Sequence, residues 1–311
     1  MRWVALISLL TLAGCGNYVF VGTDPTDAAR ETPNNAAALD CDLETLQKLA
    51  PTQQHARDSH GRTALFWAIA RHCTDGAIIL LQAGADPNAG SETTPLTMAA
   101  GMRNLKLVQA LVAHGATVNP KHVSHLTPLH AAASSGDVAT TNYLLSLGAD
   151  IHTKVHFGAT PLHYGARWPA VVKTLVTAGA SVHATDDRGV TALMMAPSWP
   201  FPNLPSGAEG VRALLGSGAD PRAVDNDGST ALIAAATCFD TEALRELLRA
   251  GADANTRTKH GQTALGMFRM TASQRLSWAN YVWALFLPSE RKARESSVEI
   301  EQILITAGAT T

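Results

Sequence analysis

Short apolar stretches at helical spacing alternate with polar turns along most of the chain. The clearest unit is 127–150, where Leu129 and Ala132 belong to one apolar stretch and Leu144 and Leu145 to a second. Residues at this spacing lie on one face of a helix, and a polar turn between two stretches brings the second helix back beside the first. The pattern therefore predicts an all-α fold built from pairs of short antiparallel helices.

Two sequence anchors recur in a fixed register. A Thr followed by Pro or Ala and then Leu opens each unit, at Thr63, Thr94, Thr127, Thr160, Thr191, Thr230 and Thr263. A Gly-Ala pair closes each unit, at Gly84, Gly115, Gly148, Gly179, Gly218, Gly251 and Gly308. The threonines are spaced by 31, 33, 33, 31, 39 and 33 residues, so the chain contains about seven copies of one supersecondary unit.

These anchors resemble those of the ankyrin repeat over about residues 40–310. Pro128 suits a first helical turn, where its missing N–H has no intrahelical partner, and Gly148 suits a left-handed residue that closes a helix. The resemblance implies an ankyrin-repeat solenoid, in which stacked units share one core. We assign residues 36–311 to this domain and interpret 42–49 as its N-terminal cap or a worn first repeat.

The N-terminus has the features of an export signal. Arg2 precedes an apolar run that ends at Leu12, which is too short to span a bilayer and fits a secretory signal. Residues 12–15, Leu-Ala-Gly-Cys, resemble the bacterial lipoprotein box, which implies cleavage after residue 14 and acylation of Cys15. An ordinary cleavable signal with an accidental cysteine is the alternative interpretation.

The interpretation of the N-terminus sets the expected location. Residues 1–14 are then a lipoprotein signal peptide and 15–35 a lipidated tether, although the apolar patch 18–21 could instead dock as a strand. Gly16 stands where an Asp would resemble an inner-membrane retention signal. We therefore expect a monomer anchored through its lipid to the cell envelope, facing the periplasm and held by the outer membrane.

Composition narrows the classes of function. Hydrophobic residues make up 46% of the 311 residues, and charged residues only 16%. The net charge of −2 argues against a nucleic-acid partner, because such binding needs a basic surface. Aromatic residues are scarce at 5%, so we expect a core of Ala, Leu and Val.

No catalytic motif stands out in the sequence. We find no Gly-x-Ser-x-Gly elbow, no phosphate-binding loop and no His-Glu-x-x-His helix. We therefore predict that the protein is not an enzyme and needs no cofactor.

The twelve histidines raise the question of a metal site. Several gather near the predicted hairpin tips, namely His122, His125, His152, His156 and His183. No cysteine or carboxylate cluster accompanies them, so we predict no metal site, while pH sensing stays open. The ankyrin resemblance implies local hydrogen bonding for His130 and His163 and turn stabilisation for Asn88, Asn119 and Asn255.

The cysteines suggest one disulfide. Cys41 and Cys73 fall near the turns between helices in neighbouring units, which we expect about 10 Å apart, slightly far for a bond without local adjustment. An exported protein meets an oxidising compartment, so a Cys41–Cys73 bond is possible. Cys238 lies in a distant unit, and we expect a buried free thiol there.

Two repeats carry insertions between their helices. Thr191 and Gly218 are 27 residues apart and Thr263 and Gly308 are 45 apart, where 21 is usual. The inserts hold Trp199 and Phe201 in repeat 5 and Trp278, Tyr281 and Trp283 in repeat 7, and Trp168 and Phe239 fall at the same point in repeats 4 and 6.

These seven aromatic residues are our candidates for partner binding, because exposed aromatic side chains are favoured anchors at interfaces. The alternative is that the inserts fold back and cap the open end of the solenoid. The ankyrin resemblance also implies docking on the face formed by hairpin tips and first helices. Candidates on that face are Arg62, Phe66, Glu92, Arg103, His125, His156 and Arg188.

We therefore expect a lipid-anchored protein that acts by binding another protein. The ankyrin and lipoprotein resemblances favour an immunity protein that neutralises a secreted toxic effector. Alternatives are a periplasmic support protein for an oxidative-stress enzyme such as catalase, an envelope scaffold and, more distantly, an enzyme.

Overall fold

The computed structural model describes residues 32–53, 55–90, 93–120, 126–197, 207–278 and 290–310. Throughout these segments the chain forms helices joined by turns, and their only β-type pairings are the isolated bridges Arg57–Thr63 and Thr185–Thr191. The chain divides into two compact units, with the boundary between His156 and Phe157. The predicted all-α fold is confirmed.

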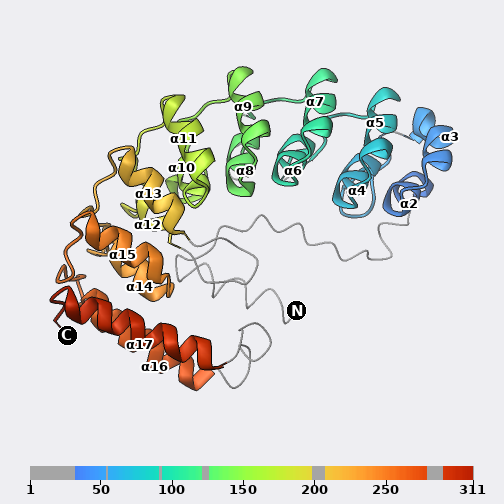
Figure 1. The fold of residues 1–311 in the computed structure, drawn as a ribbon. Helices are drawn as coiled ribbons and strands as arrows, with labels where there is room; N and C mark the ends of the chain where they lie inside the picture. Colours follow the sequence, from blue (N-terminus) through green and yellow to red (C-terminus); the bar gives the residue numbers. More distant parts are fainter. Residues whose placement is uncertain are drawn as a thin grey trace. The chain divides into compact units, whose positions relative to one another are not determined.

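The N-terminal unit consists of four helix pairs. The pairs are α2 (Pro33–Asp40) with α3 (Leu43–Gln53), α4 (Ala64–Ala70) with α5 (Thr74–Gln82), α6 (Pro95–Gly101) with α7 (Leu105–Ala113), and α8 (Pro128–Ser135) with α9 (Val138–Ser146). Figure 1 shows the first helices of these pairs in one row and the second helices in another. Each helix packs against its own partner and against the equivalent helix of the next pair.

The C-terminal unit also consists of four helix pairs, preceded by the 3-10 turn η2 (His156–Gly158). The pairs are α10 (Pro161–Gly165) with α11 (Pro169–Thr177), α12 (Ala192–Met195) with α13 (Ala208–Gly216), α14 (Ala231–Thr237) with α15 (Thr241–Arg249), and α16 (Ala264–Trp278) with α17 (Glu290–Thr306). First helices again pack on first helices and second helices on second helices.

The sequence anchors explain where the helices begin and end. Thr63, Thr94, Thr127 and Thr230 lie at helix N-caps, and each side-chain oxygen accepts a hydrogen bond from the backbone N–H three residues later. The closing glycines have positive φ, for example 77° at Gly148, which only glycine adopts without a steric penalty. Fully buried Leu and Ala side chains fill the space between neighbouring pairs.

The N-terminal cap is a complete helix pair rather than the single helix that we predicted for 42–49. Thr32 caps α2 by accepting a hydrogen bond from Asn35 N, and Pro33 occupies the first helical turn. This Thr-Pro pair stands 31 residues before Thr63, but Asn34 replaces the expected Leu and hides the anchor. The helical domain therefore begins at Pro33, within the segment that we assigned to the tether.

The insertion in repeat 7 lengthens both helices of the last pair. Helix α16 has 15 residues and α17 has 17, whereas the second helices α5, α7, α9, α11, α13 and α15 each have 9. Ile300 and Leu304 are fully buried, and the ion pair between Arg245 and Glu299, at 2.7 Å, joins α15 to α17. Ile300 and Leu304 stand as far before Gly308 as Ala243 and Leu247 of α15 stand before Gly251, so they are ordinary core positions of the repeat.

None of the helices in the described segments is both long and apolar enough to cross a membrane.

Candidate functional site

We call the turns before the first helices the hairpin tips, and three of them share one hydrogen-bonding pattern. In the tip of residues 57–62, Oδ1 of Asp58 accepts hydrogen bonds from the backbone N–H groups of His60 and Arg62, both at 2.9 Å. Asp186 and Asp225 do the same for the tips of 185–190 and 224–229. A buried or half-buried carboxylate thus closes each of these three turns.

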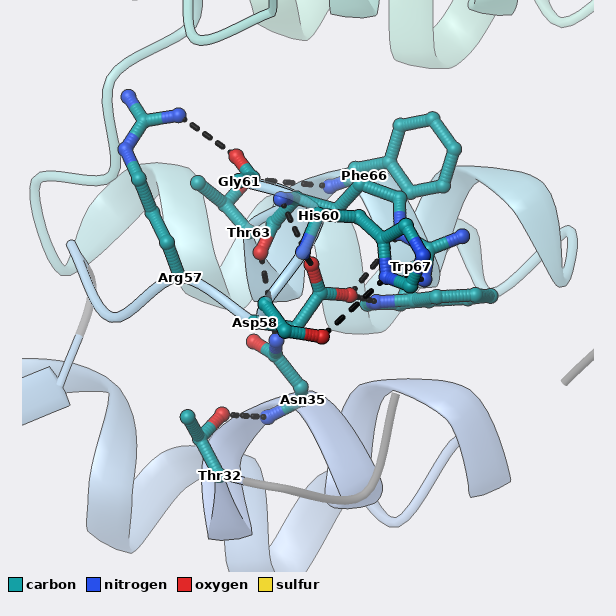
Figure 2. Close-up of polar contacts among 11 residues, drawn as sticks. Thr32, Asn35, Arg57, Asp58, His60, Gly61, Thr63, Phe66 and Trp67 are labelled. Atoms are coloured by element: carbon teal, nitrogen blue, oxygen red, sulfur yellow. Dashed lines mark hydrogen bonds and ion pairs between the residues drawn. The ribbon is translucent and has the colours of Figure 1, made fainter. Parts of the chain in front are cut away.

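The first tip surrounds Asp58 with donors, as Figure 2 shows. Its side chain is buried, and its second oxygen, Oδ2, accepts from Arg62 Nε at 2.9 Å and from the indole N–H of Trp67 at 3.0 Å. Burial alone would raise the pKa of Asp58, but the hydrogen bonds from Arg62, Trp67 and His60 outweigh it. The pKa of this carboxyl group therefore lies below the ordinary value of 3.8.

Arg62 is fixed through both its backbone and its side chain. The Asn35 side chain on α2 donates to the carbonyl oxygen of Arg62 at 3.3 Å, and the guanidinium carbon lies 4.3 Å from the centre of the Trp67 ring. Phe66 packs edge-on against Trp67 with ring centres 5.3 Å apart. The first tip therefore presents a guanidinium group held over an aromatic surface.

The C-terminal unit presents an aromatic ring at its own first tip. Phe157 is 58% exposed, although its φ of 62° is uncommon for a bulky residue. Its carbonyl oxygen accepts a hydrogen bond from Asp187 N at 2.8 Å, and the guanidinium carbon of Arg188 lies 5.7 Å from its ring centre. The next tip therefore holds the backbone that carries this exposed ring.

Successive tips of the C-terminal unit are joined by backbone hydrogen bonds. Asn226 N donates to Arg188 O at 2.8 Å, and Lys259 N donates to Asp227 O at 2.7 Å. Together with the bond from Asp187 to Phe157, these contacts link four tips in order along the unit. A surface built from these tips is thus held by main-chain contacts as well as by helix packing.

The structure corrects one of the predicted aromatic anchors. Phe239 is only 8% exposed and packs against Phe268 of α16 with ring centres 5.2 Å apart. Its left-handed backbone, with φ of 57°, turns the ring into the space between helix pairs. Phe239 is therefore a core residue, and its prediction as a binding anchor was wrong.

The other predicted anchors are described only in part. Trp168 is half-buried at the N-cap of α11, and Trp278 is the last residue of α16, with its side chain outside the described part. Residues 199, 201, 281 and 283, which are Trp199, Phe201, Tyr281 and Trp283, lie outside the described segments, as does Cys15.

Cys41 and Cys73 form a disulfide, with their Cα atoms 5.6 Å apart. The expected separation of about 10 Å was too large, because Cys41 ends α2 in a left-handed conformation and Cys73 directly precedes α5. Cys238 is buried and disulfide-bonded, so the expected free thiol was wrong.

Polar residues that recur at equivalent positions of the repeats act structurally. Asn88, Asn119 and Asn255 each donate from the side-chain amide to the carbonyl of the next unit's closing glycine, at 2.8–3.0 Å. His130 and His163 each contact the capping threonine hydroxyl of their own helix, at 2.7 and 2.8 Å. These contacts are the local roles that we predicted for both sets of residues.

The described residues contain no group of three or more His, Cys, Asp and Glu side chains that could hold a metal ion. His152 and His183 are exposed at hairpin tips, while residues 122 and 125 and the side chain of residue 156 lie outside the described part.

Two features of the tips were not apparent from the sequence. The sequence drew attention to Arg62 without separating it from its neighbours, and it gave no signal for the exposed Phe157. One feature of the sequence could have singled out Arg62. The aromatic pair Phe66-Trp67 follows the anchor Thr63, and no other repeat has an aromatic pair at those positions.

Comparison with known protein families gives a consistent result. A family described as ankyrin repeats, in three copies, matches residues 6–91, 88–155 and 205–272. A single ankyrin repeat matches residues 157–187. These ranges together cover most of the chain and extend over both compact units.

Proposed function

The chain belongs to the ankyrin-repeat family, and from this premise we propose that it is an envelope protein that acts by binding another protein. Ankyrin repeats form protein–protein interaction modules, and proteins of this family are typically non-catalytic. We propose further that a lipid on Cys15 anchors the protein in the cell envelope.

The exposed ring of Phe157 is the observation that carries the binding role for the C-terminal unit. Phe157 is a large apolar residue with 58% exposure, and its left-handed backbone is uncommon for a bulky residue. Rigid aromatic rings are favoured interface anchors because they bury a large area at little entropic cost. We therefore place a partner contact at Phe157 and the adjacent Arg188.

We further propose that the partner is a secreted toxic effector and that this chain is its immunity protein. The lipoprotein box at residues 12–15 supports the proposal, because an inhibitor tethered in the envelope lies where such a toxin must act. The contact would be a one-to-one complex that blocks the effector.

Affinity capture from envelope extracts tests this proposal. The full chain should retain a stoichiometric effector protein, and Phe157→Ala should weaken that capture by about tenfold or more, as expected for an interface anchor. Val298→Ala is the matched control, since this valine is 69% exposed but lies on α17 away from the tips. Capture of a catalase-like enzyme would favour the support role instead, and structural envelope proteins would favour a scaffold.

A further inference from the structure

The donor groups of Arg62 are only partly used within the protein. A guanidinium carries five N–H donors, of which Nε binds Asp58 and Nη2 contacts the ring nitrogen of His60 at 3.2 Å. Nη1 has no hydrogen-bond partner among the described residues. The outer end of the group is therefore available to a ligand, while its inner edge is held in place.

The position of this group is set before any ligand arrives. The side chain of Arg62 is 22% exposed, stacks on Trp67, and has its main chain bonded to Asp58 and Asn35. An ordinary surface arginine loses considerable rotamer freedom when it binds, whereas this one has already lost it. Partial burial also strengthens any charged hydrogen bond that it makes.

The hairpin fold does not itself require an arginine at this position. The residues before the other anchor threonines are Thr93, Leu126, Ala159, Val190, Ser229 and Gln262. The tip closed by Asp225 makes the same two backbone hydrogen bonds with Ser229 in the equivalent place. Turn closure therefore does not explain why Arg62 is present.

The first tip also carries a small excess of positive charge. Residues 55–63 contain Arg57 and Arg62 against Asp58, or +2 against −1, and Asp58 is buried beneath the guanidinium. His55 and His60 are exposed on the same tip. An anionic group that approaches from solvent meets the cations first.

We propose that Arg62 is a docking point for a carboxylate, namely an Asp or Glu side chain of the partner protein. The planar guanidinium matches the geometry of a carboxylate, which is why arginine predominates in such contacts. Phe66, half-buried beside Arg62, would contact apolar groups next to the acidic residue. This inference rests on the proposed binding function and names the chemistry that one of its surfaces recognises.

Selection of random peptides displayed on phage against the full chain tests the docking point. The selected peptides should be enriched in Asp and Glu. Replacing the shared acidic residue by its amide should weaken binding by about 10-fold to 100-fold, the usual effect of a hydrogen bond between charged groups. A separate comparison uses each peptide with a free and with an amidated C-terminus. If binding depends on the C-terminal carboxylate alone, the assignment to an Asp or Glu side chain is overturned.

Variants of the protein assign the effect to Arg62. Arg62→Gln should weaken acidic peptides to the same degree, and should have no further effect on the amide peptides. Arg57→Gln is the matched control, because this exposed arginine lies on the same tip and carries the same charge but bonds only to Gly61 O. A loss below about twofold is expected for it. Equal losses for both variants would mean general electrostatics and would overturn the docking point.

Two further results keep the docking point separate from the proposed function. Arg62→Lys keeps the charge without the planar fork, and it should bind acidic peptides clearly less well than the wild type even if Arg62→Gln folds poorly. Peptides that bind equally to wild type and Arg62→Lys, with no acidic preference, overturn the docking point while Phe157-dependent capture still stands. If peptide binding depends on Arg62 but Phe157→Ala does not weaken partner capture, only the contact at Phe157 is contradicted.

Discussion

The indole N–H of Trp67 donates a hydrogen bond of 3.0 Å to Oδ2 of Asp58, nine residues earlier in the chain. Both groups are buried, so this contact fastens helix α4 to the hairpin tip that precedes it. The same carboxylate oxygen accepts from Arg62, so Trp67 and Arg62 share one acceptor in the first tip.

We expect Trp67→Phe to destabilise the protein by about 1–3 kcal/mol, because it removes a donor from a buried carboxylate and shrinks a packed ring. Urea unfolding followed by circular dichroism measures the change. Phe66→Leu is the control, since this neighbouring ring is half-buried and makes no hydrogen bond through its side chain. A loss at Trp67 no greater than the loss at Phe66 would contradict a special role for the Trp67–Asp58 bond.

Asp58 predicts a defined acid sensitivity. Its pKa in the folded protein is below 3.8, so the group binds protons less readily when folded than when unfolded. The stabilisation is therefore fully present above pH 3.8 and is lost as the pH falls through the lowered pKa of the folded state. Asp58→Asn should lower the free energy of unfolding by roughly 2 kcal/mol near neutral pH. In strong acid the variant and the wild type should have nearly the same stability.

Unfolding free energies of wild type and Asp58→Asn at several pH values check this expectation. The difference between the two proteins should be flat from neutral pH down to about pH 5 and shrink below the ordinary aspartate range. A difference that grows as the pH falls would show that burial, rather than hydrogen bonding, controls this carboxyl group.

The disulfide between Cys41 and Cys73 should add measurable stability. It closes a loop with a sequence separation of 32, for which chain-entropy arguments predict about 3–4 kcal/mol. The double variant with serine at both positions should lose this amount when both proteins are compared without reducing agent. In reducing agent the difference between wild type and double variant should vanish, and a difference that persists would mean that the serines, rather than the missing bond, cause the loss.

The tip that carries Phe157 depends on a close backbone approach at Gly158. A Cβ atom there would lie 2.2 Å from Oδ1 of Asp187, and the φ of 77° is unfavourable for alanine. Gly158→Ala should therefore displace the tip, reduce partner capture and lower stability by about 1–3 kcal/mol. Gly148→Ala separates the two causes, because it has the same φ and nothing within 4 Å of its added Cβ. If Gly158→Ala and Gly148→Ala lose the same stability, backbone strain alone explains the effect and the contact with Asp187 contributes nothing.

The repeat fold could be predicted because its signals are local. Each threonine cap and each closing glycine acts on the helix next to it, so a fixed spacing in the sequence becomes a fixed spacing in the fold. The first helix of the N-terminal pair was missed because Asn34 follows Thr32-Pro33 where leucine follows the other anchors. The cap still forms, since the threonine and proline suffice to begin α2.

The direction of side chains at turns could not be predicted in the same way. Phe239 and Phe157 both have left-handed backbones and both lie between repeat elements, yet one ring is buried against Phe268 and the other is exposed. The outcome depends on which helix stands opposite, which is a non-local property. The sequence therefore predicted binding surfaces at the insertions, whereas the exposed ring of Phe157 belongs to a hairpin tip without an insertion.

Lipidation of Cys15 is the remaining prediction, and it decides where the protein works. If the box at residues 12–15 is read by the lipoprotein pathway, the mature chain should incorporate labelled palmitate and fractionate with membranes. Cys15→Ser should abolish the label and leave an uncleaved precursor, while the double variant with serine at Cys41 and Cys73, which removes a described bond and keeps Cys15, should keep both label and cleavage.

Mass spectrometry of the unreduced N-terminal peptide distinguishes an acylated Cys15 from a disulfide-bonded one. An acyl-modified Cys15 with residues 1–14 removed supports the envelope proposal, because the thiol that carries diacylglycerol can no longer form a disulfide. A peptide in which Cys15 is joined to another cysteine contradicts lipidation, since one sulfur cannot do both. In that case the chain would be exported without an anchor, and an immunity role would require it to find its effector by diffusion.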